Sequence, residues 1–284
     1  MTPDALPSLR ESLEHHGLMA KKAFGQHFLL DLNITRKIVR LGGPFDGDIV
    51  IEVGPGPGGL TRALLETGAQ KILAVEKDSR FIELLTELKE AYGDRFDVIE
   101  GDALKVDETR LLAESQSSNP ALAACKAHVV SNLPYNVGTP LLVKWLTGPW
   151  RPASMTLMFQ LEVALRIVAP TGDDDYGRLS VLAQCLCDCE KIMDLPARAF
   201  TPPPKVDSAV VKLVPKAVQP EDRVVRALEK ITAAAFGQRR KMLRSSLKSV
   251  GGEALLDKAG IDPTARAETV APQAFLSMAE ISLG

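Results

Sequence analysis

Short apolar runs alternate with amphipathic stretches along most of the chain from residue 49 onward. A short apolar run between turn residues is typical of a buried strand, whereas apolar residues spaced three or four apart are typical of one helix face. Strands and helices that alternate in this way form βαβ units with parallel strands. The pattern therefore predicts an α/β fold of Rossmann-like type, with a mostly parallel sheet and helices on both faces. The expected strands are residues 49–53, 72–76, 96–100, 128–131, 154–160, 183–193 and 209–215.

Helical patterns fill the gaps between these strands and then take over the end of the chain. In the α/β region they cover residues 60–67, 81–92, 140–147 and 161–169. Two prolines, Pro215 and Pro220, bound a short segment that is typical of a domain linker. Beyond it the helical patterns are residues 222–236, 238–250, 254–259 and 272–283. We therefore expect an α/β domain over residues 1–215, beginning with a helical segment at residues 1–45, and a small all-helical domain over residues 216–284.

The composition is that of a globular protein. With 284 residues, of which 45% are hydrophobic and 25% charged, the chain can bury a sizeable core. Its apolar runs are far shorter than the roughly 18 residues that a membrane span needs, and the N-terminus lacks the pattern of a secretion signal. We expect a cytoplasmic protein that contacts no membrane.

Three of the four cysteines, Cys185, Cys187 and Cys189, alternate along the predicted strand at residues 183–193. Four cysteines are too few for a disulfide scaffold, and zinc or redox sites usually show Cys-x-x-Cys spacing. Alternation would place all three thiols on one strand face. We expect buried, reduced thiols and no metal site.

The net charge of −2 conceals an asymmetry between the two ends of the chain. Residues 216–284 carry 11 basic and 8 acidic side chains, and residues 236–248 carry five basic side chains and no acidic one. Such a run is either a solvated helix face or a patch that binds the phosphates of a nucleic acid. The candidate RNA-binding residues are Arg239, Arg240, Lys241 and Arg244.

A glycine-rich turn follows the first predicted strand. The strand runs into Gly54-Pro-Gly56-Pro-Gly58-Gly59, and a helical pattern begins directly afterwards. Gly54, Gly56 and Gly59 match the pattern G-x-G-x-x-G, which allows a tight turn and close approach of the backbone to a ligand. Both the pyrophosphate of NAD and parts of S-adenosylmethionine fit such a turn, so the motif alone leaves the ligand open.

Two acidic residues mark the ends of the next two predicted strands. Glu76 comes 22 residues after Gly54, where a carboxylate can accept both hydroxyls of a ribose. Asp102 follows the third strand and could accept a hydrogen bond from the exocyclic amine of an adenine, although an Asp at this place can also cap a turn. The loop and the two carboxylates would line one crevice, which favours S-adenosylmethionine as the ligand.

Asn132-Leu133-Pro134-Tyr135 follows the fourth predicted strand, beside the same crevice. Together with the glycine loop at residues 52–58, this tetrapeptide resembles the adenine-N6 dimethyltransferases of ribosomal RNA. Three other segments are similar to the same family, so that the resemblance extends from about residue 20 to the end of the chain. They are Lys22-Ala-Phe-Gly-Gln-His-Phe-Leu29, Phe200-Thr-Pro-Pro-Pro-Lys-Val-Asp-Ser208, and Phe236 with Arg239-Arg240-Lys241.

The tetrapeptide suits methylation of an aromatic amine. The lone pair of adenine N6 is delocalised into the ring, and acceptors aimed at the amino hydrogens favour the tetrahedral geometry that makes it nucleophilic. The side-chain oxygen of Asn132 and the carbonyl of Leu133 are the natural acceptors. Pro134 would hold the turn rigid and Tyr135 would stack on an extruded adenine. A strong base is not required, because transfer to an amine needs mainly in-line positioning.

The resemblance implies further roles and a substrate. It implies a class I methyltransferase fold, a second stacking face from Phe200, and contact of S-adenosylmethionine with His27, Leu29 and Asn132. His27 stands where many members of the family carry Asn. The expected reaction is N6,N6-dimethylation of two adjacent adenines in the 3′-terminal hairpin of 16S ribosomal RNA, within the small (30S) subunit, by a monomer that takes part in subunit biogenesis and binds no DNA.

Other functions compete with this one. The nearest is methylation of large-subunit ribosomal RNA, as in relatives that confer macrolide resistance, although the 200–204 segment and the basic helix look more like the small-subunit enzymes. A ribosome-assembly factor whose binding matters more than its catalysis is a second alternative. An NAD-dependent dehydrogenase would leave the tetrapeptide unexplained, and adenine-N6 methyltransferases of DNA usually show Asp-Pro-Pro-Tyr instead.

Overall fold

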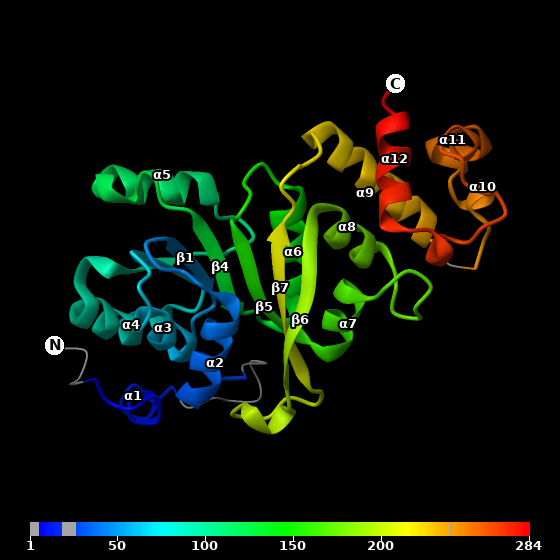
Figure 1. The fold of residues 1–284 in the computed structure, drawn as a ribbon. Helices are drawn as coiled ribbons and strands as arrows, with labels where there is room; N and C mark the ends of the chain where they lie inside the picture. The colour runs from blue at the N-terminus through cyan, green and yellow to red at the C-terminus, as the bar shows by residue number, and fades with distance from the viewer. Residues whose placement is uncertain (1–5, 19–26, 239) are drawn as a thin grey trace. The chain divides into compact units, whose positions relative to one another are not determined.

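The computed structural model describes residues 6–18, 27–238 and 240–284. Its strands form one sheet in the order β3-β2-β1-β4-β5-β7-β6, of which Figure 1 labels the part from β1 to β6. The pairs β1 with β2, β2 with β3, β1 with β4 and β4 with β5 are parallel. The strands are β1 (Ile49–Val53), β2 (Lys71–Glu76), β3 (Phe96–Glu100), β4 (Ala127–Asn132), β5 (Ser154–Gln160), β6 (Cys187–Leu195) and β7 (Ser208–Pro215).

The central strands are buried along their whole length. Every residue of β1 and β2 is buried, which requires cover on both faces and explains why these strands read as continuous apolar runs rather than alternating ones. Helix α4 packs against β2 and β3, and α3 packs against β2 and α2. The predicted α/β architecture with a mostly parallel sheet is confirmed.

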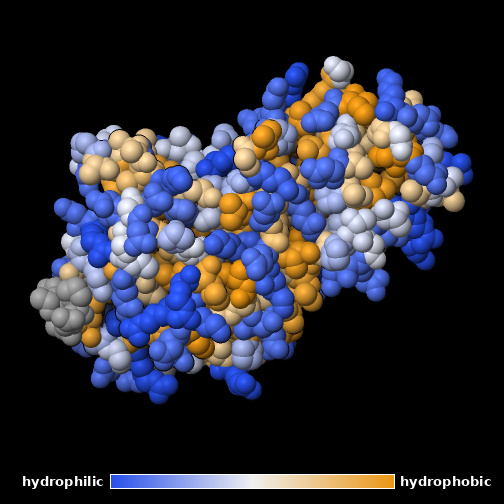
Figure 2. Space-filling view, in the orientation of Figure 1, coloured by the Kyte–Doolittle hydropathy of each residue, from blue (hydrophilic) through white to orange (hydrophobic). Residues whose placement is uncertain are grey.

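The helices begin at recognisable caps. Asp31, Asp78 and Asp107 each accept a hydrogen bond from a backbone N–H of the first turn of α2, α4 and α5, so that a donor without an intrahelical partner is satisfied. In the sheet region the helices are α1 (Leu9–His15), α2 (Leu32–Gly42), α3 (Gly59–Leu65), α4 (Ser79–Tyr92), α5 (Glu108–Ser118), α6 (Tyr135–Thr147), α7 (Leu161–Val168) and α8 (Arg178–Leu186). Hydrophilic and hydrophobic side chains are interspersed on the face shown in Figure 2.

The order of the strands creates the place for a ligand. The chain builds β1, β2 and β3 in one direction across the sheet and then returns to add β4 on the other side of β1. In doubly wound sheets a crevice opens at the carboxyl ends of the strands where the order reverses. Ile49 pairs with Lys71 of β2 and with Ala127 of β4, so the carboxyl ends of these strands lie at the same edge of the sheet.

The prediction of a single strand at residues 183–193 is wrong. Helix α8 continues to Leu186, and β6 starts at Cys187. Almost the whole of α8 from Ser180 onward is buried, so its sequence lacks the one-sided pattern that separates a helix from a buried strand. Cys185 therefore lies on a helix, and the three cysteines do not share one strand face. Their thiols are free, and burial raises the pKa of Cys185 and of Cys187 to about 12.

The chain divides into two compact units. The first consists of residues 1–142, 152–161 and 192–212, and the second of residues 143–151, 162–191 and 213–284. The second unit thus includes α7 and α8, which the sequence pattern places in the α/β domain, so the boundary at residue 215 stays a prediction. In the part of the chain that the structure describes, no helix combines the length and the apolar character that crossing a membrane requires.

The second unit contains the helices at the end of the chain (Figure 1). The half-buried ring of Phe236 contacts the buried rings of Tyr176 and Phe275, and the Tyr176 hydroxyl donates a hydrogen bond of 2.8 Å to the carbonyl of Val270. The helix predicted over residues 238–250 is replaced by a turn and two short elements. The elements here are α9 (Asp222–Phe236), α10 (Leu243–Ser246), η6 (Lys248–Val250), α11 (Gly252–Lys258), η7 (Ala267–Thr269) and α12 (Pro272–Ile281).

Candidate active site

The glycine loop after β1 has the left-handed backbone conformation that glycine favours. Gly54 and Gly56 have φ angles of +65° and +53°, a region that other residues rarely adopt. A Cβ atom at Gly56 would also lie 3.3 Å from the ring of Phe28. The loop therefore combines a left-handed backbone with close packing.

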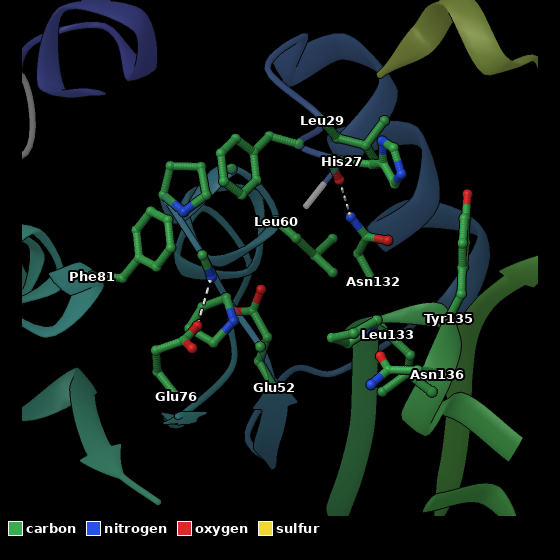
Figure 3. A pocket seen from close by; sticks show the side chains of 17 residues that line it. His27, Leu29, Glu52, Leu60, Glu76, Phe81, Asn132, Leu133, Tyr135 and Asn136 are labelled. Atoms are coloured by element: carbon green, nitrogen blue, oxygen red, sulfur yellow. Dashed lines mark hydrogen bonds between the residues drawn. The ribbon is translucent and has the colours of Figure 1, made fainter. Parts of the chain in front are cut away.

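A pocket of about 470 Å³ opens beside this loop (Figure 3), within the range of about 300–1,000 Å³ typical of small-molecule sites. It is lined by residues that precede α2 and by residues at the carboxyl ends of β1, β2 and β4. Most of the site residues expected from the sequence meet here. They are His27, Leu29, Gly54, Gly56, Glu76, Asn132, Leu133, Pro134 and Tyr135.

The sequence-based hypothesis assigns no individual role to the other lining residues, although several of them belong to its glycine loop. Phe81 lies in the first turns of α4, five residues after Glu76, and its ring meets that of Phe28 edge to face at 5.6 Å. The sequence did contain a signal for Phe81, because a residue that follows the end of β2 so closely is expected to lie near the pocket. Glu52 directly precedes the glycine-rich turn but lies in an apolar strand, and the apolar pattern gives no indication that its carboxyl group lines a pocket. The remaining lining residues are Phe28, Pro55, Pro57, Gly59, Leu60 and Asn136.

Glu76 is held by three backbone N–H groups. Its Oε1 accepts hydrogen bonds of 2.8 Å from Lys77 and from Asp78, and its Oε2 accepts one of 3.1 Å from Gly56. Burial raises the pKa of this carboxyl, and the three donors oppose that effect. The bonds fix the carboxyl at the pocket wall and tie the end of β2 to the glycine loop.

Glu52 is a buried carboxyl on β1. The hydroxyl of Thr61 donates a hydrogen bond of 2.7 Å to its Oε2. Burial raises the pKa of Glu52 to about 8, the Thr61 hydroxyl opposes the shift, and the nearby carboxyl of Glu76 adds to it. At neutral pH the pocket thus holds an uncharged acid that a cation would help to ionise.

Asn132 ends β4 with its side chain in the pocket (Figure 3). Its Nδ2 donates a hydrogen bond of 3.3 Å to the backbone carbonyl of His27. Since the amide nitrogen is engaged there, Oδ1 is the atom left to accept hydrogen bonds from a ligand. The hydroxyl of Ser131 donates to the carbonyl of Val53, which joins the carboxyl ends of β4 and β1.

Tyr135 is the first residue of α6, and both its hydroxyl and its ring make contacts. Its hydroxyl shares a hydrogen bond of 2.7 Å with the hydroxyl of Ser208. Its ring lies 5.8 Å from the ring of His27, centroid to centroid, with 30° between the planes. Burial raises the pKa of the phenol, so the ring is neutral at physiological pH.

Phe200 and Asp102 lie outside the pocket lining. The side chain of Phe200 is 3% exposed and belongs to the hydrophobic core together with Phe28 and Phe81. Asp102 lies just beyond β3, where it accepts hydrogen bonds from the backbone of Leu104 and from the Lys77 ammonium, and the latter lowers its pKa. The roles assigned to Phe200 and Asp102 therefore stay predictions.

The basic residues expected to bind RNA lie in the second unit. Arg240 and Lys241 are exposed in the turn after α9, and Arg244 is exposed on α10. Arg239 and most of the segment 22–29, from Lys22 to Gln26, lie outside the described residues. Among the described residues, no group of three or more His, Cys, Asp or Glu side chains could hold a metal ion.

Comparison with known proteins gives consistent matches over nearly the whole chain. Residues 17–282 match the model of the family described as "Ribosomal RNA adenine dimethylase". "Ribosomal RNA small subunit methyltransferase A" of Phenylobacterium zucineum is 64% identical over 280 residues, which cover 99% of this chain and 94% of that protein. The protein of the same name in Agrobacterium fabrum is 55% identical over 279 residues, which cover 97% of this chain and 98% of that protein.

Two solved structures share the fold. A dimethyladenosine transferase from Plasmodium falciparum has a TM-score of 0.70 at 26% identity, over 89% of this chain and 96% of that one. The 23S rRNA methyltransferase ErmE has a TM-score of 0.64 at 27% identity, over 89% of this chain and 98% of that one.

Replacing Glu52 with Gln should make the free energy of unfolding less dependent on pH. The carboxyl keeps its proton in the folded protein up to a pKa of about 8, whereas in the unfolded chain its pKa is about 4.3. The folded state therefore binds more protons between these values, and the contribution of Glu52 to stability falls as the pH rises through this window. Denaturant unfolding at several pH values measures the slope.

A Gln at position 52 has no proton to lose, so the variant should show a smaller fall in stability than the native protein. Glu83→Gln, at an exposed carboxylate of α4, is the matched control and should leave the slope nearly unchanged. Equal slopes for the native protein and Glu52→Gln would contradict the buried, protonated state of Glu52.

Proposed function

The chain belongs to the ribosomal RNA adenine dimethylase family, and we propose that it dimethylates N6 of two adjacent adenines in the 3′-terminal hairpin of 16S ribosomal RNA. The methyl donor is S-adenosylmethionine, and the substrate is the small (30S) subunit in the cytoplasm, where the protein acts as a monomer and takes part in subunit biogenesis. The observation that carries the proposal is the oriented carboxamide of Asn132 in a pocket bounded by a glycine loop and two acidic side chains.

The orientation of Asn132 suits the amine that it is proposed to receive. Because Nδ2 donates to the His27 carbonyl, Oδ1 and the backbone carbonyl of Leu133 are two acceptors available for the two amino hydrogens of adenine. Acceptors placed in this way favour a tetrahedral nitrogen and stabilise the positive charge that develops during transfer. The positively charged product loses its proton to water afterwards, so the site needs no strong base.

Tyr135 provides a face for the extruded base. Stacking of a base on an aromatic ring contributes about 1–3 kcal/mol, which is comparable to the cost of unstacking one base. The hydrogen bond to Ser208 and the contact with the His27 ring hold the Tyr135 ring in place before the base arrives. Phe200 could add a second face only if its buried ring turned out toward the pocket.

The pocket fits S-adenosylmethionine in its size and in its charge. The bound group supplies an electrophilic methyl carried on a sulfonium ion. The carboxyl of Glu76 can accept ribose hydroxyls, and the backbone around Gly54 and Gly56 allows close approach. Glu52 places a second carboxyl at the pocket wall, where a cation lowers its pKa and makes it an anion. A neutral Asn132 avoids a further buried charge.

Similarity to named relatives favours the small-subunit substrate over the large-subunit one. The 64% identical relative is named for the small subunit, whereas ErmE, named for 23S rRNA, is 27% identical. The exposed Arg240, Lys241 and Arg244 supply positive charge for the phosphates of the RNA, together with Arg239.

Asn132→Ala should lower the rate of methyl transfer about a hundredfold, the effect of removing one preorganised polar group that stabilises developing charge. The affinity for the cofactor should change less than the rate, since Glu76 and the glycine loop are untouched. The measurement is transfer of labelled methyl groups to undermethylated small subunits, with cofactor binding followed separately. Asn136→Ala is the matched control, because this carboxamide also lines the pocket but faces no proposed amino hydrogen. Near-normal turnover by Asn132→Ala would refute its role.

Replacing Arg240, Lys241 and Arg244 together with Ala should weaken RNA binding and flatten its salt dependence. Each phosphate contact that is lost should reduce the slope of log affinity against log salt by roughly 1. Filter binding of the small-subunit RNA at several salt concentrations measures both quantities. The control removes the same charge from α9, by replacing the exposed Arg223, Arg226 and Lys230. If the two triple variants bind alike, the RNA contact lies elsewhere.

A further inference from the structure

His27 contacts three different parts of the proposed base site. Its backbone carbonyl accepts the hydrogen bond from Asn132 that orients the carboxamide. Its ring lies 5.8 Å from the ring of Tyr135. Its Nδ1 lies 2.8 Å from the carbonyl oxygen of Pro202, in the loop that follows Phe200. A single residue in the segment that precedes α2 thus contacts the end of β4, the start of α6 and a loop that is 175 residues away in the sequence.

The partner of Nδ1 determines where the ring proton sits. A carbonyl oxygen can only accept a hydrogen bond, so Nδ1 of His27 must donate. In the neutral imidazole Nε2 then carries the lone pair. The contact is therefore a directed bond from His27 to the loop, and it selects one tautomer of the ring.

Two backbone hydrogen bonds beside this bond also join the loop to the segment that precedes α2. The N–H of Phe28 donates to the carbonyl of Thr201 at 3.0 Å, and the N–H of Thr201 donates to the carbonyl of Phe28 at 2.9 Å. Any residue at position 28 could make these two bonds. The bond to Pro202 depends on the side chain at position 27.

These contacts close a ring of interactions around the site. His27 holds the loop at Pro202, the chain continues to Ser208, Ser208 binds the hydroxyl of Tyr135, and the ring of Tyr135 returns to that of His27. The position of the stacking ring and the position of the loop are thereby coupled through one imidazole. Loss of the Nδ1 donor would break this ring of interactions at Pro202 and leave the loop held by the backbone pair of Phe28 with Thr201.

We propose that His27 is a positioning residue for the target adenine: its ring fixes the 201–208 loop and the Tyr135 ring in the geometry that receives the base. This role deepens the proposed function and rests on it. It differs from contact with the cofactor, because the partners of the side chain are Pro202 and Tyr135 rather than the glycine loop.

The two nitrogens of the ring can be tested separately by substitution. An Asn side chain places its amide nitrogen near the position of Nδ1, whereas a Gln side chain reaches to the position of Nε2. Asn at position 27 can therefore keep the donor to the Pro202 carbonyl, and Gln cannot keep it in the same geometry. Ala removes both nitrogens and the ring.

The experiment compares His27→Ala, His27→Asn and His27→Gln in methyl transfer to undermethylated small subunits. We expect His27→Ala and His27→Gln to lower kcat about tenfold, the effect of one lost hydrogen bond. His27→Asn should stay within about threefold of the native kcat. The affinity for S-adenosylmethionine should change by less than about twofold in all three variants, a separation of kcat from binding that a general loss of structure would not produce.

Several results would overturn the proposal. Native kcat in His27→Ala, equal kcat in His27→Asn and His27→Gln, or a loss confined to cofactor affinity would each do so. If His27→Ala fails to fold, the comparison of the Asn and Gln variants still decides the matter.

A spectroscopic measurement tests the contact without activity. Nitrogen-15 chemical shifts of the neutral His27 ring, assigned by their absence in His27→Asn, should show a protonated Nδ1 and an unprotonated Nε2. The opposite tautomer would overturn the bond to Pro202. Absence of methyl transfer to ribosomal RNA by the native protein would instead refute the proposed function, and this readout would still stand.

Discussion

The site depends on the pairing of β1 with the strands on its two sides. Because β2 and β4 both run parallel to β1, the glycine loop, Glu76 and Asn132 all emerge at one edge of the sheet. The hydrogen bond from the Ser131 hydroxyl to the Val53 carbonyl joins the end of β4, which leads into the tetrapeptide, to the end of β1, which leads into the glycine loop. Residues distant in the sequence therefore share a pocket.

Acidic and neutral polar side chains lie in different parts of the pocket, and this division matches the two proposed functions. The half proposed for the methyl donor contains two buried carboxyl groups, Glu52 and Glu76, and burial raises the pKa of both. Such groups respond to a cationic ligand by ionising. The half proposed for the base contains a neutral carboxamide and a neutral phenol, so charge developing on an amine there would meet oriented dipoles rather than a second anion.

Much of this arrangement was predictable from the sequence, because buried parallel strands leave clear apolar runs and the tetrapeptide is an unusual way to end one. The family predicted from these motifs is confirmed. The pattern failed at α8, which is buried nearly all round and so resembles a strand. It left open whether Phe200 is a core residue or a stacking face, and it gave no sign that His27 binds the Pro202 carbonyl, since both depend on long-range packing.

The central claim is that this pocket methylates N6 of adjacent adenines in the small-subunit RNA. The most direct test is incubation of the native protein with labelled S-adenosylmethionine and undermethylated small subunits, followed by mapping of the labelled nucleotides. We expect N6,N6-dimethyladenosine at two adjacent positions in the 3′-terminal hairpin of 16S ribosomal RNA. Label in large-subunit RNA, or on an atom other than adenine N6, would contradict it.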